Sequence, residues 1–299
     1  MKKLLLGLGL AIVLAGIGYF FIYPYDYVIR FKADTNAGTI NQTIKVWDRN
    51  LDLPGDPIEQ EDLNHLTQFI REGDSVHRYR WAITRITDST SEVRVGIRDL
   101  EHSLQNKWQV LWGGSSIQAI SEARVRDFIE GLKEHLGKIR IHIDGEAELP
   151  STFYAYVDLQ TSQHRKAAGM MDYHMLLSGE LARAKVSLNG PPMVVVDHWD
   201  MDRDSLRFEF CYPIIRSERL PEHPEIRYKR IFPKPALKAT YNGNYITSDR
   251  AWYALLDYAA SHGLEVEPTP VEVFHNNPNM GGDALQWTAE IYLPLKESE

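Results

Sequence analysis

The residue best placed to do chemistry is Glu290, the one carboxylate in an apolar and aromatic run near the carboxyl end of the chain (285–295, LQWTAEIYLPL). Alternate residues of a strand face opposite sides, so Glu290 shares its face with Tyr292 while Ile291 points to the other. An ionised carboxylate on a half-buried strand needs compensation, either from a partner in the fold or from a polar or cationic ligand. Glu290 is therefore a candidate ligand-binding or catalytic group, and a structural ion pair is the alternative.

An internal repeat contains a second acid at an equivalent position. Segment 206–214 (LRFEFCYPI) aligns without a gap with 287–295 (WTAEIYLPL), which places Glu209 on Glu290. Each half follows the order strand, helix, strand, strand: 153–159, 163–187, 193–197 and 206–213, then 236–241, 248–262, 271–275 and 285–293. Duplicated units commonly pack about a pseudo-twofold axis, so we expect the two glutamates to approach one shared groove.

Length and composition limit the classes of function. The 299 residues have room for about two domains, and the net charge of −8 without a long basic run argues against a nucleic-acid partner. The single cysteine, Cys211, excludes an intramolecular disulfide and a cysteine-based zinc site. The acidic segment 197–204 lacks the glycine and terminal glutamate of an EF-hand loop, which favours a solvated turn. We expect neither a metal nor a cofactor.

The amino-terminal segment predicts a membrane anchor. After Lys2 and Lys3, the 19 residues from Leu4 to Ile22 are largely apolar and end among aromatic residues, which is enough to span the hydrocarbon core. A cleaved signal peptide is the alternative, but no clear cleavage site follows. The two lysines predict a single-pass membrane protein with a cytoplasmic amino terminus and an exported body, although basic residues at 30 and 32 oppose this orientation.

Residues 25–149 are expected to form a first α+β domain. The pattern predicts a strand at 27–32, a helix capped at 34–36, a hairpin of 76–86 with 92–98, a strand at 103–111, an amphipathic helix at 116–136 and a strand at 138–144. This order resembles the SRPBCC (START-like, polyketide cyclase-like) superfamily, whose sheet wraps round a helix to enclose a cavity. The resemblance implies a helix-grip domain, and a solid spacer is the alternative.

Residues 153–296 resemble the GyrI-like small-molecule-binding domain, the effector-binding domain of AraC-type and MerR-type regulators. The likeness lies in 241–245 (YNGNY), 250–258 (RAWYALLDY), 268–274 (PTPVEVF) and the closing TAEIYLPL. The resemblance implies a twofold-repeated α+β fold with an antiparallel sheet, and a cleft for drug-like, often cationic, molecules. The cleft glutamate of the family maps to Glu290. Some stand-alone members are hydrolases of electrophilic small molecules. This chain has a membrane segment where the regulators have a DNA-binding domain, so transcriptional activation is not carried over.

The sequence therefore predicts an anchor (1–24), an SRPBCC-like domain (25–149) and a GyrI-like domain (150–299). The expected function is membrane-anchored binding of an amphipathic or cationic small molecule, with Glu290 as counter-ion. A hydrolase, with Glu290 as general base at a pKa raised by an apolar setting, is the first alternative, and a scaffold for an unidentified protein partner is the second. The candidate ligand contacts are Glu290, Glu209, Tyr154, Tyr156, Tyr241, Tyr245, Trp252 and Tyr292, and core packing is the alternative for each aromatic residue.

Overall fold

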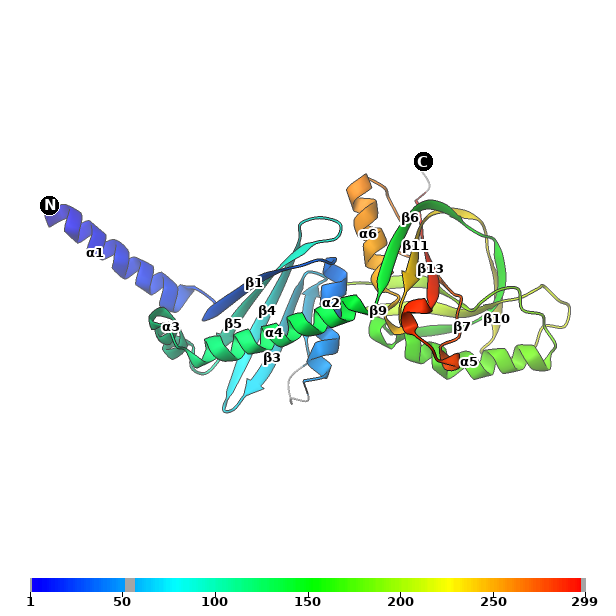
Figure 1. Cartoon of the computed structure of the whole chain (residues 1–299), viewed down its shortest axis with the longest axis horizontal. Helices are drawn as coiled ribbons and strands as arrows, with labels where there is room; N and C mark the ends of the chain where they lie inside the picture. The colour runs from blue at the N-terminus through cyan, green and yellow to red at the C-terminus, as the bar shows by residue number, and fades with distance from the viewer. Residues whose placement is uncertain (1, 52–56, 297–299) are drawn as a thin grey trace. The chain divides into compact units, whose positions relative to one another are not determined.

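The structure, a computed structural model, describes residues 2–51 and 57–296 (Figure 1). It is a mixed α+β protein with two antiparallel sheets and an apolar amino-terminal helix, which confirms the predicted fold class. The chain divides into two compact units. One comprises Met1–Ala33, Thr43–Thr84 and Ser91–Gly131, and the other comprises Asp34–Gln42, Arg85–Thr90 and Leu132–Glu299. The domain boundaries expected after residues 24 and 149 stay predictions.

The amino-terminal helix consists of α1 (Lys2–Ile17) and a π-helical turn, η1 (Gly18–Ile22). Its 20-residue segment Lys3–Ile22 is predominantly apolar and is not buried by the rest of the structure. At 1.5 Å per residue this segment is about 30 Å long, the thickness of a bilayer's hydrocarbon core. By length and composition the helix can therefore cross a membrane, and its predicted orientation stays a prediction.

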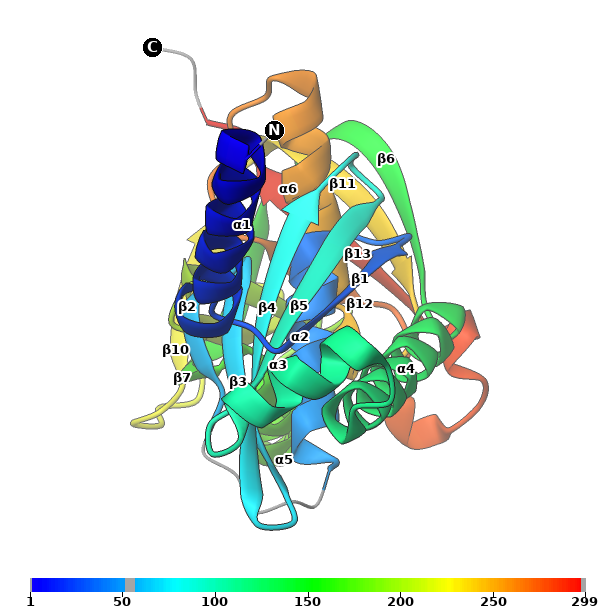
Figure 2. The ribbon, with the colours of Figure 1, turned by 90° about the vertical axis from the view of Figure 1, so that its left-hand side faces the viewer.

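The first unit is built on a five-stranded sheet in the order β1-β5-β4-β3-β2. Its strands are β1 (Tyr27–Ala33), β2 (Glu59–Asp62), β3 (His65–Glu72), β4 (Ser75–Arg85) and β5 (Ser91–Asp99). It also contains α3 (Ser103–Trp112) and the larger parts of α2 (Ala37–Arg49) and α4 (Ser116–Gly137). The ring of Phe128 from α4 packs edge-on against Trp47 of α2 and Trp81 of β4, at centroid distances of 5.6 and 5.0 Å. These ring contacts hold α4 against the sheet, and the ribbon views show the helix beside the strands (Figures 1 and 2). The SRPBCC-like interpretation of the unit stays a prediction.

Two predicted features of this region have different outcomes. The expected helix cap is confirmed, because the Asn36 side chain accepts a hydrogen bond from the Thr39 amide at 2.8 Å. The strand predicted at 103–111 is wrong, since these residues form α3. Leu104, Trp108 and Leu111 recur at helical spacing, and this period decided the local structure.

The second unit contains an eight-stranded sheet in the order β10-β7-β9-β8-β12-β13-β11-β6. Its strands are β6 (Arg140–Leu149), β7 (Thr152–Ser162), β8 (Met193–Asp200), β9 (Ser205–Pro213), β10 (Arg227–Ile231), β11 (Lys234–Asn242), β12 (Val271–Phe274) and β13 (Thr288–Pro294). The longer helices are α5 (Lys166–Arg183) and α6 (Arg250–His262), and the 3-10 turns are η2 (Gln163–Arg165), η3 (Tyr245–Thr247), η4 (Pro278–Met280) and η5 (Ala284–Gln286).

The sequence repeat appears as two halves, β7-α5-β8-β9 and β11-α6-β12-β13. They join in the middle of the sheet, where β8 pairs antiparallel with β12 and Val195 lies opposite Val271. Residues 140–149, which the predicted boundary assigned to the first domain, form β6 and pair with β11. The last strand begins at Thr288, because 284–286 form the turn η5 instead of the first residues of the predicted strand.

A buried ion pair connects the two halves on the helix-covered side of this sheet. The Lys166 ammonium at the start of α5 contacts the Glu272 carboxylate of β12, and both side chains are 0% exposed. Ser248 and the Trp252 indole also donate hydrogen bonds to this carboxylate, at 2.8 and 2.9 Å. Burial raises the pKa of Glu272, and the adjacent Lys166 charge opposes that shift. Removing either side chain would therefore leave the other charge buried without compensation and destabilise the fold.

Replacing Lys166 by Met should lower the free energy of unfolding by about 3–5 kcal/mol, because it leaves a buried carboxylate without its cation. The double variant Lys166→Met/Glu272→Gln should recover most of this loss, since the amide keeps an acceptor for Ser248 and Trp252 but carries no charge. Urea unfolding of the full chain in detergent, followed by fluorescence, measures both effects. A single variant as stable as the wild type would contradict the structural role of the pair.

Candidate ligand-binding site

Glu209 and Glu290 lie on the same face of the eight-stranded sheet. Across the sheet, Glu209 is opposite Val195, Val195 is opposite Val271, and Val271 is opposite Tyr292. Tyr292 and Glu290 are two residues apart on β13 and therefore face the same side. The two acids are three strand-to-strand steps apart, about 14 Å along the sheet at a spacing of about 4.8 Å.

Apolar side chains cover the face between the two acids. They form one cluster of buried residues from both halves of the repeat: Leu149, Tyr154, Met193, Val195, Cys211, Ala236, Val271 and Tyr292. Tyr156 and Val273 pack against this cluster and are only partly buried. Each glutamate is therefore a polar group at the margin of an apolar surface, which is the composition typical of small-molecule sites.

Glu290 has three partners within the fold. The Lys238 ammonium donates to its Oε1 at 2.7 Å, the Tyr292 hydroxyl donates to its Oε2 at 3.0 Å, and His275 Nε2 lies 3.5 Å from Oε2. The Glu290 side chain is still 29% exposed and Lys238 is 23% exposed. The site is thus a half-buried ion pair that solvent can reach.

The pKa of Glu290 is shifted in the direction opposite to the one expected for a general base. Burial raises the pKa of this carboxyl, but the hydrogen bonds from Lys238 and Tyr292 and the Lys238 charge outweigh burial, and the net pKa is lowered. The expectation that an apolar setting raises the pKa of Glu290 is wrong, because the sequence did not reveal the neighbouring ammonium. The carboxylate is ionised at neutral pH.

The Lys238 ammonium occupies a cation position formed by two groups. It lies 2.7 Å from the Glu290 carboxylate and 5.5 Å from the centroid of the Tyr292 ring. A carboxylate and the face of an aromatic ring attract a cation together, one by charge and the other by its quadrupole. Glu290 and Tyr292 therefore already hold a cation, which is supplied by a neighbouring strand.

Glu209 lies in a different environment, although the repeat makes it the counterpart of Glu290. It is 2% exposed, and it accepts hydrogen bonds from Lys229 at 2.8 Å and from the Tyr154 hydroxyl at 2.6 Å. Burial raises its pKa against the opposing effects of these two donors. Glu209 is therefore the less accessible acid of the pair.

Glu209 and two neighbouring carboxylates have the spacing of a metal site. Ligand atoms of Asp158, Asp197 and Glu209 lie within 4.8 Å of one another. Cations of the fold already pair with them: Arg227 lies 2.6 Å from Asp158, and Lys229 lies 3.9 Å from Asp197. Geometry allows a metal here, but ammonium and guanidinium groups supply the positive charge.

The structure separates the aromatic residues predicted as ligand contacts. Tyr292 adjoins Glu290, while Tyr154 contacts Glu209 and stacks edge-on with Tyr156 at a centroid distance of 5.7 Å. Tyr241 follows Thr240, which is opposite Glu290, and so points to the other face of the sheet.

Tyr245 and Trp252, like Tyr241, are engaged within the core. Trp252 donates to buried Glu272, and the Tyr245 hydroxyl donates to the backbone carbonyl of Thr288 at 2.8 Å. The Tyr241 hydroxyl donates to the Asn244 carbonyl at 2.9 Å. These three side chains have hydrogen-bonding roles in the fold, and their expected contact with a ligand stays a prediction.

Sequence reasoning missed the basic partners of both glutamates. Lys238 lies on β11, which pairs with β13, and Lys229 lies on β10, which is separated from β9 by β7. Neither lysine is close to its glutamate in sequence. Lys238 is two residues away from both Ala236 and Thr240 on β11, so the alternation along the strand predicts that these three side chains share one face of the sheet. Strand register is needed to place it beside Glu290.

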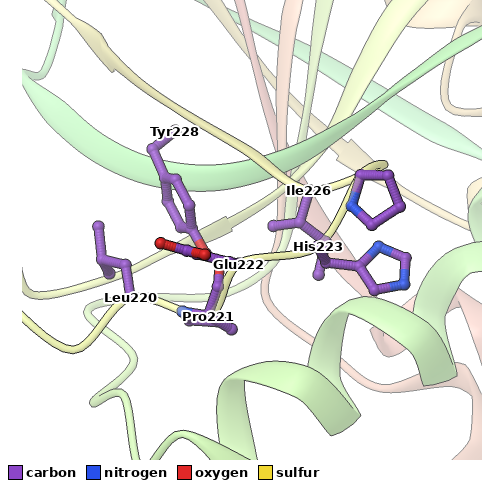
Figure 3. A pocket seen from close by; sticks show the side chains of 7 residues that line it. Leu220, Pro221, Glu222, His223, Ile226 and Tyr228 are labelled. Atoms are coloured by element: carbon purple, nitrogen blue, oxygen red, sulfur yellow. The ribbon is translucent and has the colours of Figure 1, made fainter.

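Three cavities lie elsewhere in the two units. The largest, about 570 Å³, is formed by the segment that joins the two repeat halves (Figure 3), and its lining residues are Leu220, Pro221, Glu222, His223, Pro224, Ile226 and Tyr228. The other two have volumes of about 220 and 330 Å³. None of these three is lined by Glu209 or Glu290, so the candidate site is the partly exposed ion pair of Glu290 and not one of these cavities.

Comparison with known proteins gives matches among solved structures. No protein-family model matches the sequence, and no curated protein matches it. The EcmrR C-terminal domain is similar with 14% identity and a TM-score of 0.44, covering 54% of this chain and 99% of that one. SAV2435 bound to tetraphenylphosphonium is similar with 10% identity and a TM-score of 0.37, covering 52% of this chain and 94% of that one.

A hydrolase from Listeria innocua is also similar, with 12% identity and a TM-score of 0.33, covering 53% of this chain and 92% of that one. About half of this chain thus covers nearly the whole length of each of these three structures.

The two tyrosine hydroxyls provide a matched test of how the two acids differ. Tyr154→Phe removes a donor from the buried Glu209 carboxylate and should lower the free energy of unfolding by about 1–3 kcal/mol. Tyr292→Phe removes a donor from the half-exposed Glu290, where water can replace it, and should cost less than about 1 kcal/mol. Urea unfolding of the two variants measures the difference. Equal losses would show that the two acids are equally desolvated.

Proposed function

We propose that this chain is a membrane-anchored protein that binds a small molecule, and that its ligand is an amphipathic organic cation with Glu290 as counter-ion. The observation that carries the proposal is the position of Lys238, whose ammonium lies 2.7 Å from the Glu290 carboxylate and 5.5 Å from the centroid of the Tyr292 ring. These two groups already bind a cation that belongs to the chain itself. A ligand with the same charge would take the place of the lysine.

Exchange of Lys238 for a ligand is energetically feasible. An accessible ion pair contributes only about 0–1 kcal/mol, because water stabilises both charges when they separate. Burying about 100 Å² of apolar ligand surface against the neighbouring cluster would contribute about 2.5 kcal/mol. A cation that also has an apolar body can therefore displace the lysine, whereas a small hydrated cation cannot.

The burial of Glu209 is the reason that we place the ligand at Glu290, in the second half of the repeat, and not at Glu209. Glu209 is 2% exposed and Lys229 is held against it, so a ligand would have to leave a buried charge unpaired during exchange. Glu290 imposes no such penalty. Binding is also favoured over hydrolysis, since a lowered pKa makes Glu290 a weaker general base.

Membrane anchoring is supported by the amino-terminal helix. Its segment Lys3–Ile22 is predominantly apolar and is not buried, over a length that matches a bilayer. An anchored receptor would encounter amphipathic ligands at the membrane surface, where such molecules concentrate.

Isothermal titration of the full chain in lipid nanodiscs with benzyltrimethylammonium tests the counter-ion role. Glu290→Gln should weaken binding about tenfold, about 1.4 kcal/mol, because the ligand loses its counter-charge. Lys238→Met should strengthen binding by up to about fivefold, because the competing ammonium is gone. Empty nanodiscs correct for partition of the cation into lipid.

The matched control is Lys229→Met, the same change beside the buried glutamate of the other half. It should leave the affinity for the cation unchanged. Benzyl alcohol, a neutral aromatic probe, should bind the wild type and Glu290→Gln equally. If Lys238→Met and Glu290→Gln both bind benzyltrimethylammonium as the wild type does, Glu290 is not the counter-ion.

A further inference from the structure

Helix α3 has the reverse of the polarity expected for a helix on a water-exposed surface. Its polar residues Asn106 and Lys107 are buried, with 5% and 2% exposure. Apart from Gln105, its exposed residues are large and apolar: Leu104 at 53%, Trp108 at 57%, Leu111 at 57% and Trp112 at 76%. A surface helix in water normally turns its apolar face inward. We therefore expect this apolar face to contact a surface or a lipid phase, and not bulk water.

The buried polar residues attach α3 to the carboxyl end of the amino-terminal helix. The Lys107 ammonium donates to the backbone carbonyls of Tyr19, Phe20 and Tyr23, at 3.1, 3.3 and 2.5 Å. Tyr19 and Phe20 belong to the last helical turn and Tyr23 is the residue that follows it. Carbonyls at this end of a helix lack partners within the helix and lie at the negative end of its dipole. The Asn106 amide donates to Asp99 at 2.8 Å and holds α3 against β5.

Aromatic rings continue from the end of the amino-terminal helix onto α3. Phe20 contacts Trp108 at a centroid distance of 6.1 Å, and Trp108 contacts Trp112 at 6.0 Å. Phe21, next in the chain, is 74% exposed. The apolar surface of the helix and the exposed face of α3 are therefore continuous, and both lie in the first unit (Figures 1 and 2).

We infer that the exposed face of α3, formed by Leu104, Trp108, Leu111 and Trp112, lies in the interface of the lipid bilayer that the amino-terminal helix spans. This inference rests on the proposed anchoring. The apolar helix ends at Ile22, so the bilayer surface would lie beside the residues to which Lys107 is bound. Tryptophan favours this region, because its ring is apolar and its indole N–H finds polar partners there. The buried polar and exposed apolar residues match this location.

The consequence is that α3 sets the position of the first unit at the membrane. A single helix followed by a flexible linker would leave the following sheet free to tumble. A second contact through α3, tied to the helix end by three hydrogen bonds and to β5 by Asn106, holds the sheet against the bilayer surface. The inference thus concerns how the anchored protein is presented, and not the ligand-binding face of the second unit.

The test uses the full chain in phosphatidylcholine vesicles, with and without lipid brominated in the acyl chain close to the headgroup. Flotation first shows whether the chain is bound to vesicles. Bromine should quench the tryptophan fluorescence of the wild type, and Trp108→Phe/Trp112→Phe should lose most of that quenching. The control is Trp287→Phe, which changes a tryptophan of the second unit and should leave the quenching unchanged.

The outcomes separate the inference from the anchoring. A chain that floats and loses bromine quenching only in the α3 double variant supports the inference. A chain that floats but is quenched equally in the wild type and the double variant overturns it, as would be found if a second copy or another protein covered α3, and leaves anchoring intact. A chain that does not float overturns the proposed anchoring and the inference with it.

Discussion

The antiparallel pairing of β8 with β12 is the constraint on which the second unit depends. It joins the two repeat halves into one sheet and sets which side chains share a face, from β10 at one edge to β6 at the other. Because side chains alternate along a strand, a slip of one residue at this junction would bring the two acids onto opposite faces. The buried pair of Lys166 and Glu272 crosses the same junction between the halves and opposes such a slip.

Duplication gave the two halves the same glutamate but not the same chemistry. Both acids have a lysine and a tyrosine as partners, and they differ mainly in access to water. At Glu209 the carboxylate is buried, so removing its exposed lysine would leave a buried charge without a partner, whereas the Glu290 carboxylate is partly exposed and its ion pair can open at little cost. Asymmetry in burial, more than in residue type, distinguishes a structural acid from one that can exchange its partner.

In the first unit, too, the partners of a lysine decide which surface stays exposed, but here the lysine is buried and the apolar side chains are outside. Lys107 is buried because carbonyl groups at the end of a helix compensate its charge, and the apolar side of α3 is left outside. In both units a lysine from one element satisfies the unpaired acceptors of another. These contacts decide which surfaces remain available for a ligand or for lipid.

The sequence by itself determined the repeat, most of the strands and helices, the apolar amino-terminal helix and the common side of Glu290 and Tyr292. Local periodicity encodes these features, because a period of two or 3.6 residues is set by the residues of one segment. Only the tertiary structure decided that Lys238 lies beside Glu290, that the pKa of this acid is lowered, and that Tyr241 faces the other side of the sheet. Strand register and side-chain partners come from segments far apart in the chain, so a single segment does not contain them. For the same reason, the helical spacing of Leu104, Trp108 and Leu111 was present in the sequence, whereas the outward direction of their face depended on where Lys107 found its acceptors.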